Sequence, residues 1–279
     1  MMRPCDYRMR DGRICARSSL PEDDYCILHS SFETKEVTAF NAEMKALLKA
    51  KNYDFSGFVF PRDVNLGDMG FARGIPVSFA GARFAYGMRM DLERLDNDID
   101  FSNVIFTRAA SFSNNTFFGS IRFSRAEFRA DTSFALTVVR GNARFDGAVF
   151  YGKADFSNID IQKETSFAGV KFVKEAAFSG AVFGAATDFE KAVFNEDANF
   201  ANASFIADTK FSYGSFHGKG IFANAHFIGP STFTKTDFYK ESNFSNAVFV
   251  TYPDVREARF NVRLDFMSKI KRAGRRGVR

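Results

Sequence analysis

The sequence lacks the features that indicate a disulfide-linked or membrane-spanning protein. It has no tryptophan, three cysteines and six prolines among 279 residues. No run of about 18 apolar residues occurs, so no membrane-spanning helix is predicted, and the first residues do not resemble a signal peptide. All three cysteines lie within the first 26 residues, and an odd number does not indicate a disulfide framework. We therefore expect a protein of the reducing cytoplasm.

Net charge is also scarce outside the C-terminal end. The chain carries a formal charge of +5. Residues 256–279 contain nine basic residues against Glu257 and Asp265, a surplus of seven, so the remaining 255 residues carry −2. The basic character of the protein therefore comes from its C-terminal end.

Phenylalanine, in contrast, is abundant, with 37 residues. From Phe101 to Phe266, apolar residues recur at steps that alternate between five and six. Of the 31 positions in this register, only Val139, Ile161 and Val255 are not phenylalanine. An internal repeat of eleven residues therefore dominates the chain.

The same register extends toward the N-terminus, with one interruption. Its earlier positions are Phe55, Phe60, Leu66, Phe71, Phe79, Phe84, Met90 and Leu95. A step of eight replaces a step of six across Gly74 and Pro76. We expect this two-residue insertion to form a bulged loop on one coil.

The residues between the phenylalanines exclude a helical reading. A period of eleven also suits a right-handed coiled coil, but steps of five and six would place successive phenylalanines on different helix faces. Glycine, asparagine, serine and aspartate recur between them and favour turns. The residue two before each phenylalanine is small, which allows it to point inward in a narrow coil: Ala143, Ala148, Ala154, Ala176, Ala181, Ala192, Ala198 and Ala203.

Residues 53–266 resemble the pentapeptide-repeat family, whose unit has a small residue, then Asp or Asn, then a central Leu or Phe. The resemblance implies an all-β fold, a right-handed quadrilateral parallel β-helix with coils of about 22 residues. Positions 22 apart should then stack in columns. One such column contains residues that tolerate positive φ at tight corners: Asn158, Gly180, Asn202, Asn224 and Asn246.

Residues 31–52 are predicted to form an amphipathic helix. Ser30 and Glu33 have the spacing of a capping box. The helix would carry an apolar stripe at helical spacing, formed by Val37, Phe40, Met44, Leu47 and Leu48. We expect it to plug the first coil, because an open solenoid end exposes apolar core and unpaired strand edge. A partner-binding helix is the alternative.

Residues 1–30 contain Cys5, Cys15, Cys26 and His29, spaced C-x9-C-x10-C-x2-H. Three thiolates and one imidazole are a common ligand set for structural zinc, and four protein ligands leave no open position for catalysis. The alternative is three reduced thiols packed beside a histidine. The spacing also resembles the WRC zinc module of plant growth-regulating factors, which implies nucleic-acid binding. Five arginines against five acidic residues give these thirty residues no net charge, which argues against contact with DNA.

Residues 267–279 are predicted to be a basic tail. Apolar residues near its start would close the last coil or join two rods into a homodimer through their C-terminal ends: Leu264, Phe266, Met267 and Ile270. The tail is either simply solvated or contacts nucleic acid, an anionic membrane surface or an acidic partner. The residues available for such a contact are Lys269, Lys271, Arg272, Arg275, Arg276 and Arg279.

The sequence favours a non-catalytic scaffold that binds a protein or nucleic-acid partner. Some pentapeptide-repeat proteins imitate duplex DNA and modulate type II topoisomerases, which is the first alternative, although it requires a strongly acidic rod. A β-helix enzyme acting on carbohydrates is the second. His217 and His226 are the only histidines outside the predicted zinc cluster, and neither has an evident nucleophile or acidic partner.

Overall fold

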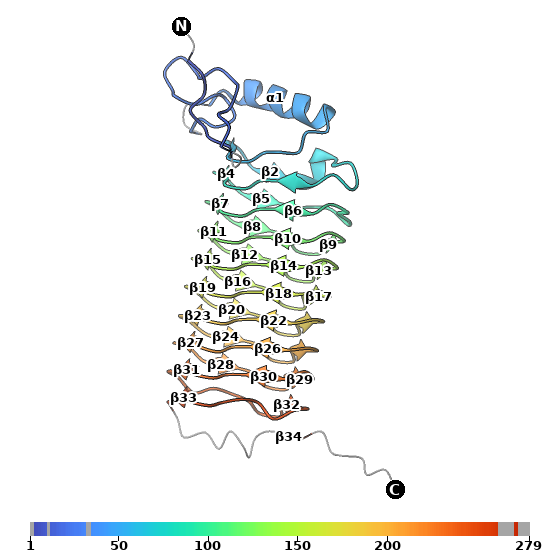
Figure 1. Ribbon diagram of the computed structural model, residues 1–279, viewed down its shortest axis with the longest axis vertical. Helices are drawn as coiled ribbons and strands as arrows, with labels where there is room; N and C mark the ends of the chain where they lie inside the picture. The colour runs from blue at the N-terminus through green and yellow to red at the C-terminus, as the bar shows by residue number, and fades with distance from the viewer. Residues whose placement is uncertain (1–2, 10–11, 32–34, 262–270, 273–279) are drawn as a thin grey trace.

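The chain forms a long four-sided β-helix with a helix and a small loop module at its N-terminal end (Figure 1). The computed structural model describes residues 3–9, 12–31 and 35–261, and the backbone of residues 271–272. Each regular coil contributes a two-residue strand to each of four parallel sheets, numbered I to IV in the order in which the chain visits them. None of the described helices is long and apolar enough to cross a membrane.

Sheets I and II are visited first in each coil. Sheet I comprises β1 (Val59–Phe60), β4 (Arg83–Phe84), β7 (Ile105–Phe106), β11 (Glu127–Phe128), β15 (Val149–Phe150), β19 (Lys171–Phe172), β23 (Val193–Phe194), β27 (Ser215–Phe216), β31 (Asp237–Phe238) and β33 (Arg259–Phe260). Sheet II comprises β2 (Val64–Asn65), β5 (Met88–Arg89), β8 (Ala110–Ser111), β12 (Thr132–Ser133), β16 (Ala154–Asp155), β20 (Ala176–Ala177), β24 (Ala198–Asn199) and β28 (Gly220–Ile221).

Sheets III and IV complete the coil. Sheet III comprises β9 (Thr116–Phe117), β13 (Val138–Val139), β17 (Asp160–Ile161), β21 (Val182–Phe183), β25 (Ser204–Phe205), β29 (His226–Phe227), β32 (Val248–Phe249) and β34 (Lys271–Arg272). Sheet IV comprises β3 (Val77–Ser78), β6 (Ile99–Asp100), β10 (Ile121–Arg122), β14 (Ala143–Arg144), β18 (Thr165–Ser166), β22 (Thr187–Asp188), β26 (Thr209–Lys210) and β30 (Ser231–Thr232).

The strand register confirms the predicted coil of 22 residues. Phe150 pairs with Phe172, and Phe172 pairs with Phe194. Across the predicted insertion the offset grows by two, because Phe60 pairs with Phe84. The extra length lies in that first coil, which contains the 3-10 helix η1 (Leu66–Met69) and the loop that follows it.

Stacked phenylalanine rings form the core of the rod. Phe189 lies between Phe167 and Phe211 in its column, with ring centroids 4.8 and 4.9 Å away and planes within 5° of parallel. It also meets Phe178 of the neighbouring column edge to face, at 5.6 Å and 89°. Offset-stacked and edge-to-face contacts are the favourable arrangements for aromatic pairs. The side chain of Phe189 is fully buried, so each ring contributes both apolar burial and ring contacts.

The five-residue corners turn through residues in the left-handed conformation. The predicted column between sheets II and III is confirmed, with φ between 55° and 67° from Asn158 to Asn246. A second column, between sheets IV and I, includes bulky residues such as Lys191 and Tyr213, both with φ of 59°. Lys191 N donates to Ser212 O of the next coil at 2.9 Å. The sequence did not indicate this column, because hydrogen bonds between coils impose the conformation on side chains that do not favour it.

The six-residue corners use aspartate to satisfy backbone groups of the next coil. Asp131 Oδ1 accepts from Lys153 N at 2.9 Å, and Asp197 Oδ1 accepts from Lys219 N at 2.8 Å. The extra residue in these corners places a backbone amide of the next coil within reach of the aspartate carboxylate. Aspartates at these corners therefore have a local structural role.

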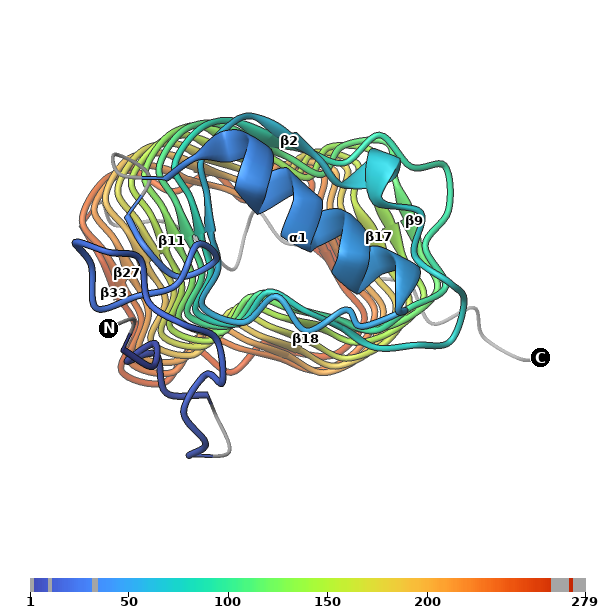
Figure 2. The same ribbon diagram turned by 90° about the horizontal axis from the view of Figure 1, so that it is seen from above.

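A helix covers the N-terminal end of the rod. Helix α1 (Val37–Lys49) lies across the opening of the first coil (Figure 2). Its buried Phe40, Met44 and Leu47 face the core, and Phe40 meets Phe60 edge to face at 5.6 Å. The unpaired core at this end is thereby covered, as the apolar stripe predicted.

The predicted start of this helix is wrong. It begins at Val37 rather than at residue 31, and its N-cap is Glu36, whose carboxylate accepts from Thr38 N and Ala39 N. Ser30 instead belongs to the preceding turn, because Ser30 N donates to Cys26 O at 2.8 Å. Ser30 therefore does not cap the helix, and the other half of the predicted capping box lies outside the described residues.

The C-terminal coil is less regular than the rest. Phe260 is only half-buried, although it stacks on Phe238 at 4.9 Å. Phe266 and the other apolar residues predicted to close the rod lie outside the described residues. Strand β34 pairs with β32 on sheet III, so that sheet continues into the segment predicted to be a tail.

Candidate metal centre at the N-terminal end

A short hairpin brings the first two predicted ligands together. Antiparallel bridging joins Pro4 to Ser18, and Gly12 turns the chain with φ of 84°. Cys5 and Cys15 lie on the two arms of this hairpin, and both are fully buried. Backbone pairing therefore places two thiols side by side in a segment with little regular secondary structure.

A second turn supplies the other two ligands. Leu20 N donates to Tyr25 O at 2.9 Å, which closes a loop immediately before Cys26. Cys26 N donates to Cys5 Sγ at 3.2 Å, and His29 N donates to Cys26 O at 3.0 Å. The C-x2-H spacing is thus one tight turn that presents a thiol and an imidazole to the same point.

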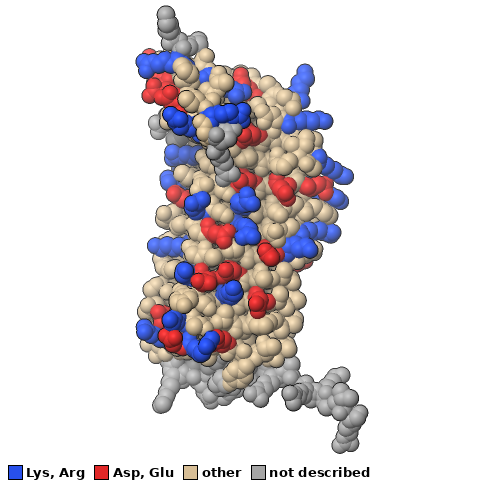
Figure 3. Space-filling view, viewed as in Figure 1, with Lys and Arg blue, Asp and Glu red and all other residues tan. Residues whose placement is uncertain are grey.

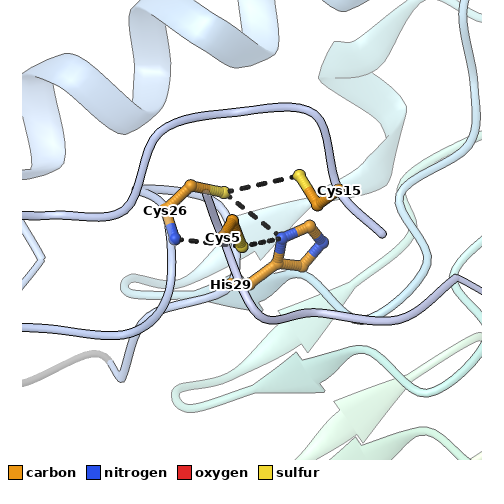
Figure 4. A group of neighbouring side chains, drawn as sticks. All are labelled: Cys5, Cys15, Cys26 and His29. Carbon is orange, nitrogen blue, oxygen red and sulfur yellow. Dashed lines mark hydrogen bonds between the residues drawn. The ribbon is translucent and has the colours of Figure 1, made fainter. Parts of the chain in front are cut away.

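The four ligand atoms form a compact cluster (Figure 4). All lie within 4.8 Å of one another. Cys15 Sγ is 4.0 Å from Cys26 Sγ, while His29 Nδ1 is 3.2 Å from Cys26 Sγ and 3.6 Å from Cys5 Sγ. Tetrahedral zinc with typical bond lengths separates two sulfurs by about 3.8 Å and a sulfur from a nitrogen by about 3.5 Å. The cluster therefore has the size and donor set of a closed tetrahedral zinc site.

Burial controls the protonation of this cluster. It raises the pKa of the Cys26 thiol to about 12, because a thiolate loses its hydration there. Burial also lowers the pKa of His29 to about 4, which keeps the imidazole neutral near pH 7. The histidine is therefore ready to bind a cation, whereas a metal must displace a proton from Cys26.

Aromatic contacts join the cluster to the first coil. The His29 ring stacks on Tyr7 at 3.9 Å and meets Phe58 edge to face at 5.3 Å. It also hydrogen-bonds to the backbone of Ser56. Gly57 makes room for this packing, since a Cβ there would lie 2.0 Å from the Tyr7 ring. The module therefore rests on a corner of the rod.

Lys35 holds three parts of the N-terminal end together. Its Nζ donates to Leu28 O at 2.9 Å and to Val59 O at 2.7 Å, and it lies 4.7 Å from the centre of the Phe40 ring. Val59 N in turn donates to Leu28 O at 2.9 Å, so the ligand turn covers the outer edge of β1. Burial lowers the pKa of Lys35 to about 7.

Sequence reasoning missed the residues that support the cluster, Tyr7, Gly57 and Lys35. Gly57 carried a signal, because it occupies a corner of the repeat where Gly81 stands in the next coil. Lys35 carried none, because a lysine among polar residues does not indicate burial.

The remaining candidate residues do not join this site. His217 follows β27 on sheet I and stacks on Tyr239 at 4.6 Å. His226 lies in β29 on sheet III, across the rod from sheet I. The structure therefore does not bring these two histidines together. The basic residues from Lys269 onward lie outside the described residues, apart from the backbone of Lys271 and Arg272.

Comparisons with known proteins concern the rod. Residues 145–193 match the family described as pentapeptide repeats (9 copies). A solved structure of trypsin-treated QnrB1, a plasmid-mediated fluoroquinolone resistance protein, is 12% identical, with a TM-score of 0.25 over 75% of this chain and 91% of that chain. The search of curated proteins gave no match. The predicted repeat family is thus confirmed for residues 145–193, in the middle of the β-helix.

Proposed function

We propose that the protein is a non-catalytic scaffold whose outer surface binds a protein or nucleic-acid partner in the cytoplasm. The observation that supports this most directly is the solid interior of the rod. Columns of mostly phenylalanine side chains fill it from Phe55 to Phe249, and all of them are buried except Phe71, which is half-buried. A partner can then be recognised only by the outward residues of the sheets and corners, which the repeat places in regular rows.

The charges on that surface favour a scaffold over a DNA mimic. Mimicry needs a continuous acidic stripe, whereas basic and acidic side chains are intermixed on the face shown in Figure 3. Acids and bases also pair between successive coils, as in Lys153–Glu175 at 3.3 Å and Lys174–Glu196 at 2.9 Å. Such pairs cancel the field that would imitate a duplex.

The proposal includes one structural zinc ion at the N-terminal end. Cys5, Cys15, Cys26 and His29 would hold it, as their donor set and spacing support. A zinc ion would supply the cohesion that the small apolar content of this module cannot. Because the ligand turn covers the edge of β1, the ion would also protect that edge from unwanted strand pairing.

Elemental analysis of freshly purified protein tests the zinc site. We expect one equivalent of zinc per chain, and less than a tenth of that in a Cys15→Ser variant. Ser19→Ala is the matched control, since Ser19 is a buried residue of the same module that is not a ligand. Metal-free protein with unchanged module folding would contradict the proposal.

The scaffold role is tested by recovering partners from the native cytoplasm, with and without nuclease, and then measuring direct binding with purified components. A partner that binds the intact rod and is displaced by charge reversals on one sheet supports the proposal. Turnover of a carbohydrate that depends on outward residues would contradict it.

The basic tail is proposed to contact an anionic partner. Its six cationic residues, Lys269, Lys271, Arg272, Arg275, Arg276 and Arg279, would allow about six phosphate contacts. Affinity for duplex DNA should then fall with salt at a slope of about −0.9 per contact. A variant lacking residues 269–279 that keeps full affinity would show that the tail makes no such contact. Dimerisation through the C-terminal end stays a separate prediction.

A further inference from the structure

Half the circumference of the last four coils bears almost no charge. We call this surface the neutral sector and define it by residues 176–187, 198–207, 220–234 and 242–253. None of these segments contains Asp, Glu, Lys or Arg. They form sheets II and III, the corners beside sheet III and, in the third segment, β30 of sheet IV. Asp208 interrupts the sector at the corner that follows β25. The equivalent half-coil directly above, residues 154–165, carries Asp155, Asp160, Lys163 and Glu164.

A row of exposed apolar side chains runs along this sector. Ile206, Ile228 and Val250 occupy equivalent positions after sheet III, with 40%, 46% and 55% of each residue exposed. Hydrogen bonds between coils hold them in line, since Ile228 N donates to Phe205 O at 2.8 Å and Val250 N to Phe227 O at 3.0 Å. This row is the apolar ridge. Figure 3 shows the corresponding uncharged area at the lower right of the rod.

A row of mostly small residues lies beside the ridge. The next position in the four coils is occupied by Ala185, Ala207, Gly229 and Thr251. Any Cβ on Gly229 would lie 2.3 Å from the Ala207 backbone, so the coils leave no room for a larger residue there. The surface thus presents an apolar ridge next to a row of mostly small residues, both repeating at the strand spacing of about 4.8 Å.

We propose that the neutral sector binds a second copy of this chain, with the two rods side by side and antiparallel. In a twofold interface the same surface of both copies takes part, so that surface must be complementary to itself. With the axis near Ile228, Ile206 would lie opposite Val250 of the partner copy, so the two apolar ridges would lie against each other. The side chains of a second rod repeat at the same strand spacing as those of the first, so contacts can repeat along the whole sector. A partner of another fold lacks this match.

The lack of charge on the neutral sector also favours a second copy of this chain as its partner. Two identical charged faces would oppose like charges, which costs several kcal/mol per interface. The neutral sector avoids this cost, and it offers nothing to attract a nucleic acid or an acidic protein. Four coils and a width of about eight residues give about 500 Å² per copy. The total of about 1,000 Å² is the lower limit for a specific interface, so the affinity should be micromolar.

Sedimentation equilibrium of the full chain, from low to several hundred micromolar, tests the proposal. We expect a monomer–dimer equilibrium that Ile228→Lys weakens by at least about tenfold, because two lysines would meet at the axis. Gln162→Lys is the control, since Gln162 is exposed at the equivalent corner three coils higher, outside the sector. Both variants should melt like the parent.

Mixing the Ile228→Lys and Ile228→Glu variants should restore the dimer, because opposite charges then face each other. A chain that stays monomeric at every concentration would overturn the proposal. So would a dimer that Ile228→Lys leaves intact, which would indicate contact through another surface such as the C-terminal end.

Discussion

The rod and the N-terminal module are stabilised by different kinds of contact. In the rod, each phenylalanine sits among others like it, as Phe189 does between Phe167 and Phe211. In the module, four side chains, Cys5, Cys15, Cys26 and His29, converge on one point. A repeated core distributes stability over many equal contacts, whereas the module depends on one cluster. Single substitutions should therefore act locally in the rod and globally in the module.

The largest expected effect is loss of a zinc ligand. Cys26→Ala should abolish zinc binding, because three ligands cannot close the tetrahedron, and structural zinc contributes about 10–16 kcal/mol in small metal-dependent modules. Hydrogen exchange should show residues 3–31 losing protection while residues 101–249 keep theirs. Equal loss of protection along the rod would show that the two regions are not independent.

Removal of a core ring comes next. Phe189→Ala should lower the free energy of unfolding by about 3–5 kcal/mol, because it leaves a cavity in a column of rings. Phe260→Ala should cost less than half as much, since Phe260 is only half-buried. Denaturant unfolding measures both, and a loss below about 1 kcal/mol for Phe189→Ala would contradict a core held by stacked rings.

Acid should weaken the module before it weakens the rod. Zinc must displace the proton of Cys26, whose pKa burial raises to about 12. His29, with a pKa of about 4, has no proton to release above that pH. The affinity for zinc should therefore fall by at least about tenfold for each unit of falling pH, because the Cys26 proton competes with the metal. Competition with a chelator between about pH 6 and pH 8 measures this, and a flat profile would argue against thiolate ligands.

The smallest expected effect comes from a matched pair of glycine substitutions, one beside the module and one in the rod alone. Gly57 and Gly81 occupy the same corner in successive coils, with φ of 72° and 69°. Gly81→Ala should cost about 1–2 kcal/mol for the left-handed conformation alone, since no atom lies near the new Cβ. Gly57→Ala should also displace Tyr7 and loosen the module, which zinc affinity and hydrogen exchange of residues 3–31 would reveal. Identical behaviour of the two variants would mean that Tyr7 does not join the module to the rod.

Much of the structure of the rod could be predicted because the same sequence pattern recurs in every coil. A period of eleven over 31 positions specifies which residues point inward, and the column from Asn158 to Asn246 specifies the corners between sheets II and III. The four metal-site residues could also be chosen, since their types and spacing suit one donor set. Each of these features depends on local spacing alone, which the sequence displays directly.

The tertiary structure decided the features that depend on contacts between distant segments. Lys35 is buried because Leu28 and Val59, far apart in the sequence, both offer carbonyl oxygens to it. Lys191 and Tyr213 adopt positive φ because the stacked coils hold them there. A sequence pattern records what a residue prefers, whereas these conformations arise from the neighbours that folding supplies.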